Sequence, residues 1–110
     1  MEHVTWPGIS GQSYTMELYP VGILFFKKPG VYIFCKLSPL IAGKWAAIYV
    51  GECQDFDDRL NLNLQNHPRW TCIQREGATN ISALFIPGER SLRLAAQADL
   101  RQRIKAPCNR

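Results

Sequence analysis

The sequence predicts an α+β fold, a small antiparallel β-sheet of three to four strands flanked by helices. Three observations favour this class: short runs of β-branched and aromatic residues, a later change to helical periodicity, and strands that precede the first helix. The chain has 110 residues, of which 46% are hydrophobic, and this is enough for one domain with a packed core. No apolar run approaches the roughly 20 residues that a membrane-spanning helix needs.

Four segments have the composition of strands. Tyr14–Tyr19 alternates apolar and polar side chains, which is typical of a half-buried strand. Val31–Cys35 and Trp45–Val50 are runs of β-branched and aromatic residues, and we expect these neighbours to pair as an antiparallel hairpin. Asn80–Ile86 has the same character and is predicted as a further strand.

Helical periodicity begins after the second strand of this hairpin. Asp55 is the expected N-cap of a helix that runs to about Gln65, with an apolar stripe formed by Phe56, Leu60 and Leu64. A short helical piece is predicted over residues 69–75. The terminal helix is predicted over residues 89–104, with a core face made of Leu92, Ala96, Leu100 and Ile104.

The domain boundaries follow from composition. Residues 1–13 are rich in Gly, Pro and Ser, so we expect a loosely held N-terminal arm, followed by a single domain over residues 14–110. A secretory signal is not expected, because Glu2 and His3 stand where a basic and then apolar stretch would begin.

The four cysteines form no CxxC pair, and neither histidine lies at a zinc-type spacing from one. We interpret all four as reduced thiols of a cytoplasmic protein; the alternatives are an accidental pair or a metal site assembled in space. The formal net charge of +4 permits a polyanionic partner but does not require one.

Two tyrosine motifs stand on the strands of the predicted hairpin. Gly30-Val31-Tyr32 begins the first strand, and Tyr49-Val50-Gly51 ends the second. Arg59 follows Tyr49 by ten residues on the first helix, and Pro107-Cys108-Asn109 stands near the end of the chain. This ordered set resembles the GIY-YIG nuclease domain of homing endonucleases, excision-repair incision subunits and structure-specific junction nucleases, over about residues 30–109.

The resemblance implies a GIY-YIG-like sandwich and a metal-dependent endonuclease that hydrolyses phosphodiester bonds of DNA, with branched or single-stranded DNA as candidate substrates. The implied catalytic residues are Tyr32, Tyr49, Arg59, His67 and Gln97. In this family one tyrosine, helped by a metal-bound water, acts as the base. A tyrosine hydroxyl titrates near pH 10, so it needs a neighbouring cation to act near neutrality. An arginine can form two hydrogen bonds to phosphate oxygens, which is the role expected of Arg59.

Four further residues are candidate substrate contacts. Gly51 and Asn109 occupy positions of the family pattern, and Asn109 is also expected to be a structural hydrogen-bonder near the site, because its amide can serve two loops at once. Lys44, in a hairpin tip longer than the family usually has, and Arg93, on the terminal helix, are cations that can contact phosphates. Each cation can equally belong to a solvated face.

The main departure from the family pattern is Gln97, which stands where the family has its metal-binding glutamate. An amide oxygen carries no charge, whereas Mg²⁺ or Mn²⁺ favours carboxylate. Asp99 lies about 200° further around the helix, and Glu89 lies roughly 12 Å away along it, so neither replaces the glutamate. Gln97 is either an introduced substitution or a natural one. The chain is therefore expected to be an attenuated or inactive endonuclease that would hold its divalent ion weakly at Gln97.

Other interpretations remain open. The chain could be a non-catalytic nucleic-acid-binding module that uses the same cleft, or a protein-interaction domain with a nuclease-like fold. Arg59 could pair with Asp55 one turn earlier. His67 could line the cleft or cap the end of the first helix. The two tyrosines could be core residues with satisfied hydroxyls. No membrane partner is expected.

Overall fold

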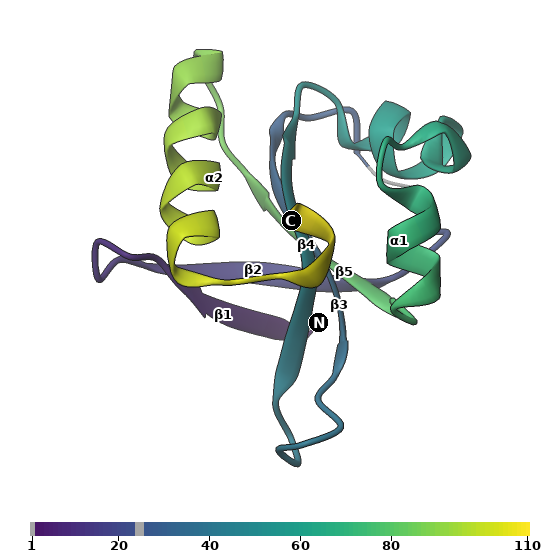
Figure 1. Cartoon of the computed structure of the whole chain (residues 1–110). Coiled ribbons are helices and arrows are strands. Elements are labelled where there is room, and N and C mark those ends of the chain that lie inside the picture. The colour runs from purple at the N-terminus through teal and green to yellow at the C-terminus, as the bar shows by residue number, and fades with distance from the viewer. Residues whose placement is uncertain (1, 24–25) are drawn as a thin grey trace.

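The computed structural model describes residues 2–23 and 26–110. A curled antiparallel sheet of five strands forms its centre (Figure 1), so the α+β class is confirmed with more strands than expected. The strands follow the spatial order β1-β2-β5-β3-β4 and are β1 (His3–Pro7), β2 (Ser13–Pro20), β3 (Gly30–Leu37), β4 (Trp45–Cys53) and β5 (Asn80–Phe85). The helices are η1 (Asp58–Leu62), η2 (Leu64–Asn66), α1 (Trp70–Arg75), α2 (Arg90–Arg103) and η3 (Pro107–Asn109). No helix in the described part of the chain is long and apolar enough to cross a membrane.

The additional strand, β1, lies in the segment expected to be a loose arm. β1 pairs antiparallel with β2, and the buried Trp6 donates a hydrogen bond from Nε1 to Ser82 Oγ at 2.9 Å. The glycines and polar residues of this segment form the turn between β1 and β2, where the Gly8 amide donates to the Gln12 carbonyl. Asp99 of α2 accepts hydrogen bonds from the Ser10 amide and hydroxyl and from the Tyr14 hydroxyl. The expectation of a loose arm is therefore wrong for residues 3–7.

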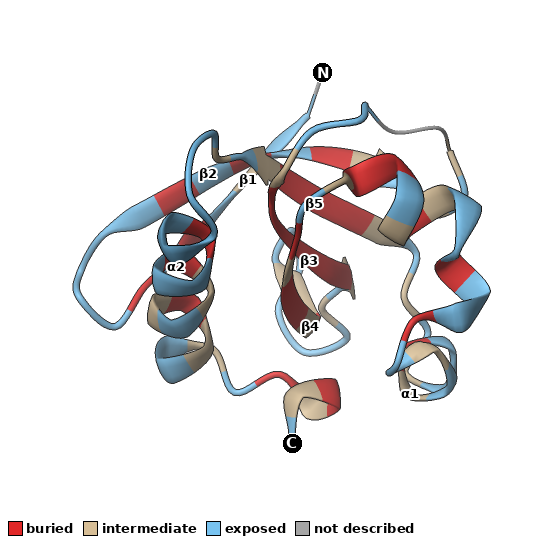
Figure 2. Ribbon diagram, turned by 90° about the horizontal axis from the view of Figure 1, so that it is seen from above, coloured by how far each residue is buried: buried red, intermediate tan, exposed pale blue. Residues whose placement is uncertain are grey.

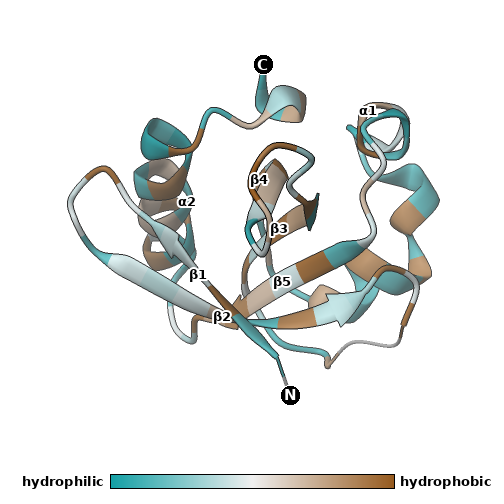
Figure 3. Ribbon diagram, turned by 90° about the horizontal axis from the view of Figure 1, so that it is seen from below, coloured by the Kyte–Doolittle hydropathy of each residue, from teal (hydrophilic) through white to brown (hydrophobic). Residues whose placement is uncertain are grey.

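The sheet separates two apolar cores, with α2 over one face and η1, η2 and α1 over the other (Figure 2). Side chains of β3 alternate between them: Val31 and Ile33 face α2, whereas Tyr32 and Phe34 face α1. Both faces are covered, which explains why this strand reads as a continuous apolar run. Hydrophobic residues are concentrated on β5 and the β3–β4 hairpin between the helices (Figure 3).

The helix predicted after β4 is shorter and wider than expected. The Asp55 carboxylate accepts hydrogen bonds from the amides of Asp57 and Asp58, so its capping role is confirmed. η1 is a π-helix, because the Asn63 amide donates to the Asp58 carbonyl five residues earlier, and the Asn63 side chain donates to the Asp58 carboxylate. A 3-10 turn, η2, follows. The predicted apolar stripe is buried all the same: Phe56, Leu60 and Leu64.

The core face of α2 differs from the prediction at its first turn. Leu92 is 54% exposed, whereas its neighbour Arg93 is buried. Arg93 can occupy the buried position because its guanidinium is paired with the carboxylate of Glu52 at 3.1 Å. Ala96 and Leu100 lie in the core as predicted.

The cysteines divide into two pairs. Cys35 and Cys53 are buried free thiols, as expected, and burial raises the pKa of each to about 12. Cys72 of α1 and Cys108 of η3 form a disulfide, so the prediction of four reduced thiols is wrong for this pair. Sequence spacing could not identify it, because the two residues meet only when η3 docks beside α1, which brings their Cα atoms to 5.8 Å. The cytoplasmic location remains a prediction, and only Cys35 and Cys53 of the four cysteines on which it was based are free thiols.

Replacing both disulfide cysteines with alanine should lower the free energy of unfolding by about 4 kcal/mol. The bond closes a segment with a sequence separation of 36, and constraint of the unfolded chain scales with the logarithm of that length. Urea unfolding of wild type and of Cys72→Ala/Cys108→Ala would measure the difference. A reductant should lower the urea midpoint of the wild type and leave that of the double variant unchanged. A wild-type urea midpoint that is the same with and without reductant would contradict the presence of the disulfide.

Candidate functional site

The two tyrosine motifs meet because β3 and β4 pair in one register. Tyr32 lies opposite Gly51, and the tyrosine rings of residues 32 and 49 have centroids 6.1 Å apart. A Cβ atom at Gly51 would lie 2.6 Å from the Tyr32 hydroxyl oxygen and 2.8 Å from a ring carbon of Tyr49. Gly51, predicted as a substrate contact, therefore has a packing role: only a residue without a side chain lets the two rings approach.

Gly30 of the first motif is required by a different close approach. A Cβ atom there would lie 2.0 Å from the Leu84 carbonyl oxygen of β5 and 2.5 Å from the Phe56 ring. Both glycines of the motifs are thus explained by packing of the sheet.

His67 belongs to the tyrosine cluster. Its Nε2 lies 2.7 Å from the Tyr32 hydroxyl, and its ring is 4.9 Å from that of Tyr49 between centroids. Its Nδ1 accepts the Arg69 amide at 3.0 Å, so in the neutral ring Nε2 carries the proton and donates to Tyr32. The His67 ring is buried in this cluster, and its backbone amide caps the end of η2 by donating to the Leu64 carbonyl.

Burial sets the protonation of this cluster. Burial, and secondly the proximity of Tyr49, raise the pKa of Tyr32 far above its usual range, although the Arg59 guanidinium opposes the shift. Burial and then Arg59 lower the pKa of His67 to about 4. At neutral pH Tyr32 is therefore protonated and His67 is neutral. Tyr32 is also 0% exposed, so it cannot contact a substrate. Tyr49 is half-buried and is therefore the more exposed of the two tyrosines.

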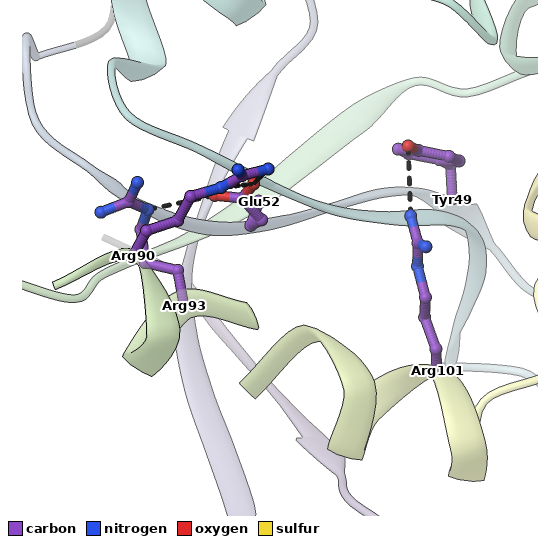
Figure 4. Close-up of polar contacts among 5 residues, drawn as sticks. All are labelled: Tyr49, Glu52, Arg90, Arg93 and Arg101. Atoms are coloured by element: carbon purple, nitrogen blue, oxygen red, sulfur yellow. Dashed lines mark hydrogen bonds and ion pairs between the residues drawn. The ribbon is translucent and has the colours of Figure 1, made fainter. Parts of the chain in front are cut away.

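Arg101 of α2 holds Tyr49 from the other side of the strand (Figure 4). Its Nη2 donates to the Tyr49 hydroxyl at 3.2 Å, and its Nε donates to the Val50 carbonyl at 2.9 Å. The Asn109 amide completes the contact, since its Oδ1 accepts the Val50 amide at 2.8 Å and its Nδ2 donates to the Val50 carbonyl at 3.0 Å. Asn109 thus takes the place of a neighbouring strand at the outer edge of β4, and it positions the motif instead of contacting substrate through these groups.

Glu52 forms a second connection between β4 and α2 (Figure 4). Its two carboxylate oxygens pair with Arg93 at 3.1 Å and with Arg90 at 3.4 Å. Arg93, predicted to contact substrate, is neutralised and buried, so the structure does not bring it to an exposed phosphate. Glu52 was not predicted as a site residue. Its signal in the sequence is an acid directly after the second motif in a chain whose terminal helix is rich in arginine.

Gln97 lies on α2 between these two connections. It is four residues from both Arg93 and Arg101, so the three side chains share one helix face, which is turned towards β4. Arg93 contacts Glu52 and Arg101 contacts Val50, so Gln97 lies between these two contacts along the helix. Asp99, the rejected substitute, holds the β1–β2 turn instead.

These donors do not fit a resident divalent ion. Gln97 offers a single neutral carbonyl oxygen, and the Glu52 carboxylate is occupied by two arginines. Among the described residues there is no group of three or more His, Cys, Asp or Glu side chains that could hold a metal ion. Mg²⁺ and Mn²⁺ prefer carboxylate oxygens, so the residues present here do not suit either ion.

Arg59 is half-buried on η1, and its charge acts on both Tyr32 and His67. It also lines a polar surface hollow together with Lys27, Asp55 and Asp58. Within the described part of the chain Arg59 makes no ion pair, so the predicted alternative of a salt bridge to Asp55 does not form. Lys44 lies at the far end of β4, exposed, and does not join the cluster.

The stability of the protein should fall as the pH drops from about 6.5 towards 4, and part of this fall should come from His67. In that interval the unfolded histidine takes up a proton, whereas the folded one stays neutral until its pKa of about 4. Urea unfolding at pH 7 and pH 4.5 should show a smaller loss for His67→Gln, which keeps a donor for Tyr32 but cannot titrate. Parallel losses in the two proteins would mean that His67 is not held neutral by the fold.

No protein-family model, curated protein or solved structure matches this chain. The likeness to the GIY-YIG nuclease domain accordingly rests on the residues of the two motifs, Arg59, His67 and Asn109. The structure brings Tyr32, Tyr49 and His67 together and bonds Asn109 to Val50, and the resemblance itself stays a prediction.

Proposed function

We propose that the chain is a GIY-YIG-type domain that binds DNA at a phosphodiester, with an endonuclease activity attenuated by Gln97. The observation that carries this proposal is the cluster of Tyr32, Tyr49 and His67, on which the Arg59 charge acts. Gln97 lies on the face of α2 that is turned towards β4. The chemistry of Arg59, Tyr49 and Gln97 is that of phosphoryl recognition: a guanidinium for phosphate oxygens, a reachable phenol, and a side-chain oxygen where a carboxylate would recruit a cation.

Each group has a defined part in this proposal. Arg59 would bind non-bridging oxygens, since no carboxylate of the described residues neutralises it. Tyr49 would donate its hydroxyl hydrogen to a phosphate oxygen, while Arg101 donates to the Tyr49 oxygen. Tyr32 and His67 would support Tyr49 from within the core, because both are buried behind it.

A second candidate is a DNA-binding module without hydrolysis. The specific observation in its favour is the neutralised Glu52, which leaves the face around Gln97 with no free carboxylate to recruit a cation. This candidate uses the same Arg59 and Tyr49, so DNA affinity alone does not separate the two.

Gln97→Glu should raise DNA cleavage by about a hundredfold or more in the presence of Mg²⁺ or Mn²⁺. The exchange restores one carboxylate in nearly the same volume, and single groups that stabilise transition-state charge are commonly worth this much. Nicking of plasmid and cutting of short branched and single-stranded DNA would be measured for wild type and variant. The double variant Gln97→Glu/Arg59→Ala is the matched control and should lose the gain, which distinguishes the activity from a contaminating nuclease.

A Gln97→Glu protein that cleaves none of these substrates with either metal would contradict the endonuclease proposal. Affinity as a function of salt then decides the second candidate, because each phosphate contact contributes roughly 0.7 to 0.9 to the slope of log affinity against log salt. A flat salt dependence would exclude both candidates.

A further inference from the structure

The four arginines of α2 differ in whether they are bonded to another group of the protein. Arg90 and Arg93 share the Glu52 carboxylate, and Arg101 is committed to Tyr49 and the Val50 carbonyl. Arg103, at the end of the helix, is exposed, and no ion pair involves it among the described residues. Glu52 offsets only one of the charges of Arg90 and Arg93, so some positive charge remains at the exposed Arg90. At the C-terminal end of α2, Arg103 is an exposed cation that no carboxylate of the described residues offsets.

An open hollow of about 800 Å³ lies at this end of the helix. The hollow is lined by β1, by the beginning of β4 and by the segment that follows α2. These elements meet where the β3–β4 hairpin projects from the sheet (Figure 1). Three exposed cations line it, Lys44, Arg103 and Lys105, together with the half-buried ring of Trp45. No Asp or Glu of the described residues lines the hollow, whereas Asp55 and Asp58 line the one beside Arg59.

We propose that this hollow binds the sugar–phosphate backbone of a single DNA strand, the same strand whose phosphodiester lies at Tyr49. The inference rests on the proposed function and extends it with a second contact region. Three unneutralised cations without a nearby carboxylate suit a polyanion. The Trp45 ring selects a single strand, because unpaired bases present their faces to aromatic side chains, whereas bases in a duplex are already stacked.

The two regions lie along one strand at a spacing that DNA can bridge. Trp45 and Tyr49 are four residues apart on β4, a distance of roughly 13 Å for an extended chain. A register shift between them places Trp45 on the α2 face and Tyr49 on the α1 face, so the DNA strand would cross the open edge of β4. Nucleotides repeat at roughly 3.4 Å in each strand, so about four would connect them. Lys44, predicted from the sequence as a substrate contact, acts in this arrangement on the flank of the strand instead of at the tyrosine cluster.

The test uses fluorescence anisotropy with a labelled twelve-nucleotide oligo-dT and the full chain. Lys44→Ala/Arg103→Ala should bind about tenfold more weakly, with a slope of log affinity against log salt smaller by about 1.4 for two single-strand contacts. The matched control is Arg69→Ala/Arg75→Ala, which removes two exposed arginines on the α1 side and should leave the slope unchanged. Tryptophan emission should be quenched on binding, and Trp45→Phe should remove this quenching.

Arg59→Ala separates the failure of this inference from the failure of the proposed function. If Arg59→Ala weakens binding but Lys44→Ala/Arg103→Ala does not, the second contact region is wrong and the proposed function stands. If Lys44→Ala/Arg103→Ala weakens binding but Arg59→Ala does not, the strand does not pass the tyrosine cluster and both fail. Binding of Lys44→Ala/Arg103→Ala to phosphatidylserine vesicles would also be measured. If this variant loses vesicle binding and keeps the oligo-dT affinity of the wild type, the hollow binds a membrane surface and the inference is overturned.

Discussion

The pairing of Tyr32 with Gly51 across β3 and β4 determines the geometry around which this domain is built. The missing side chain at Gly51 makes room for two tyrosine rings on the α1 side of the sheet. His67 then closes over both rings and satisfies the buried Tyr32 hydroxyl. Each of these groups needs the others, because a buried hydroxyl or imidazole without a partner would destabilise the fold. The cluster is thus a part of the core whose outer member, Tyr49, reaches the surface.

A second constraint is the open edge of β4, the last strand of the sheet. An unpaired strand edge invites association with other chains unless something covers it. Here the Asn109 side chain bonds both polar groups of Val50, and Arg101 adds a further donor to the same carbonyl. The disulfide to α1 fixes the short helix that carries Asn109. The covalent link, the edge closure and the position of Tyr49 are therefore parts of one connection between the C-terminus and the sheet.

Sequence patterns predicted the elements well where periodicity and burial agree. The central hairpin, β2, β5 and the capping role of Asp55 could all be derived from residue types alone. β1 could not, because its glycine- and proline-containing surroundings resemble a loose arm, and only pairing with β2 orders it. The exposed Leu92 was also unpredictable, since the buried position goes to an arginine that finds Glu52 in the folded state. The motif residues were found by their order, but which tyrosine is reachable depends on packing across the sheet.

The arginines of α2 show how structure changes the meaning of a charge count. A net charge of +4 suggests a generally basic surface, yet three arginines of this helix hold it against β4 through Glu52, Val50 and Tyr49. Charges engaged in this way contribute little to the field that a distant polyanion experiences, since a neighbouring carboxylate cancels them or the strand partly covers them. Other cations lie near the two ends of β4, Arg59 at one end and those around Trp45 at the other, while Arg69 and Arg75 are exposed on the α1 side. In the arrangement that we propose, a DNA strand would run along the edge of β4, past Tyr49, instead of over the helix whose arginines hold it against that strand.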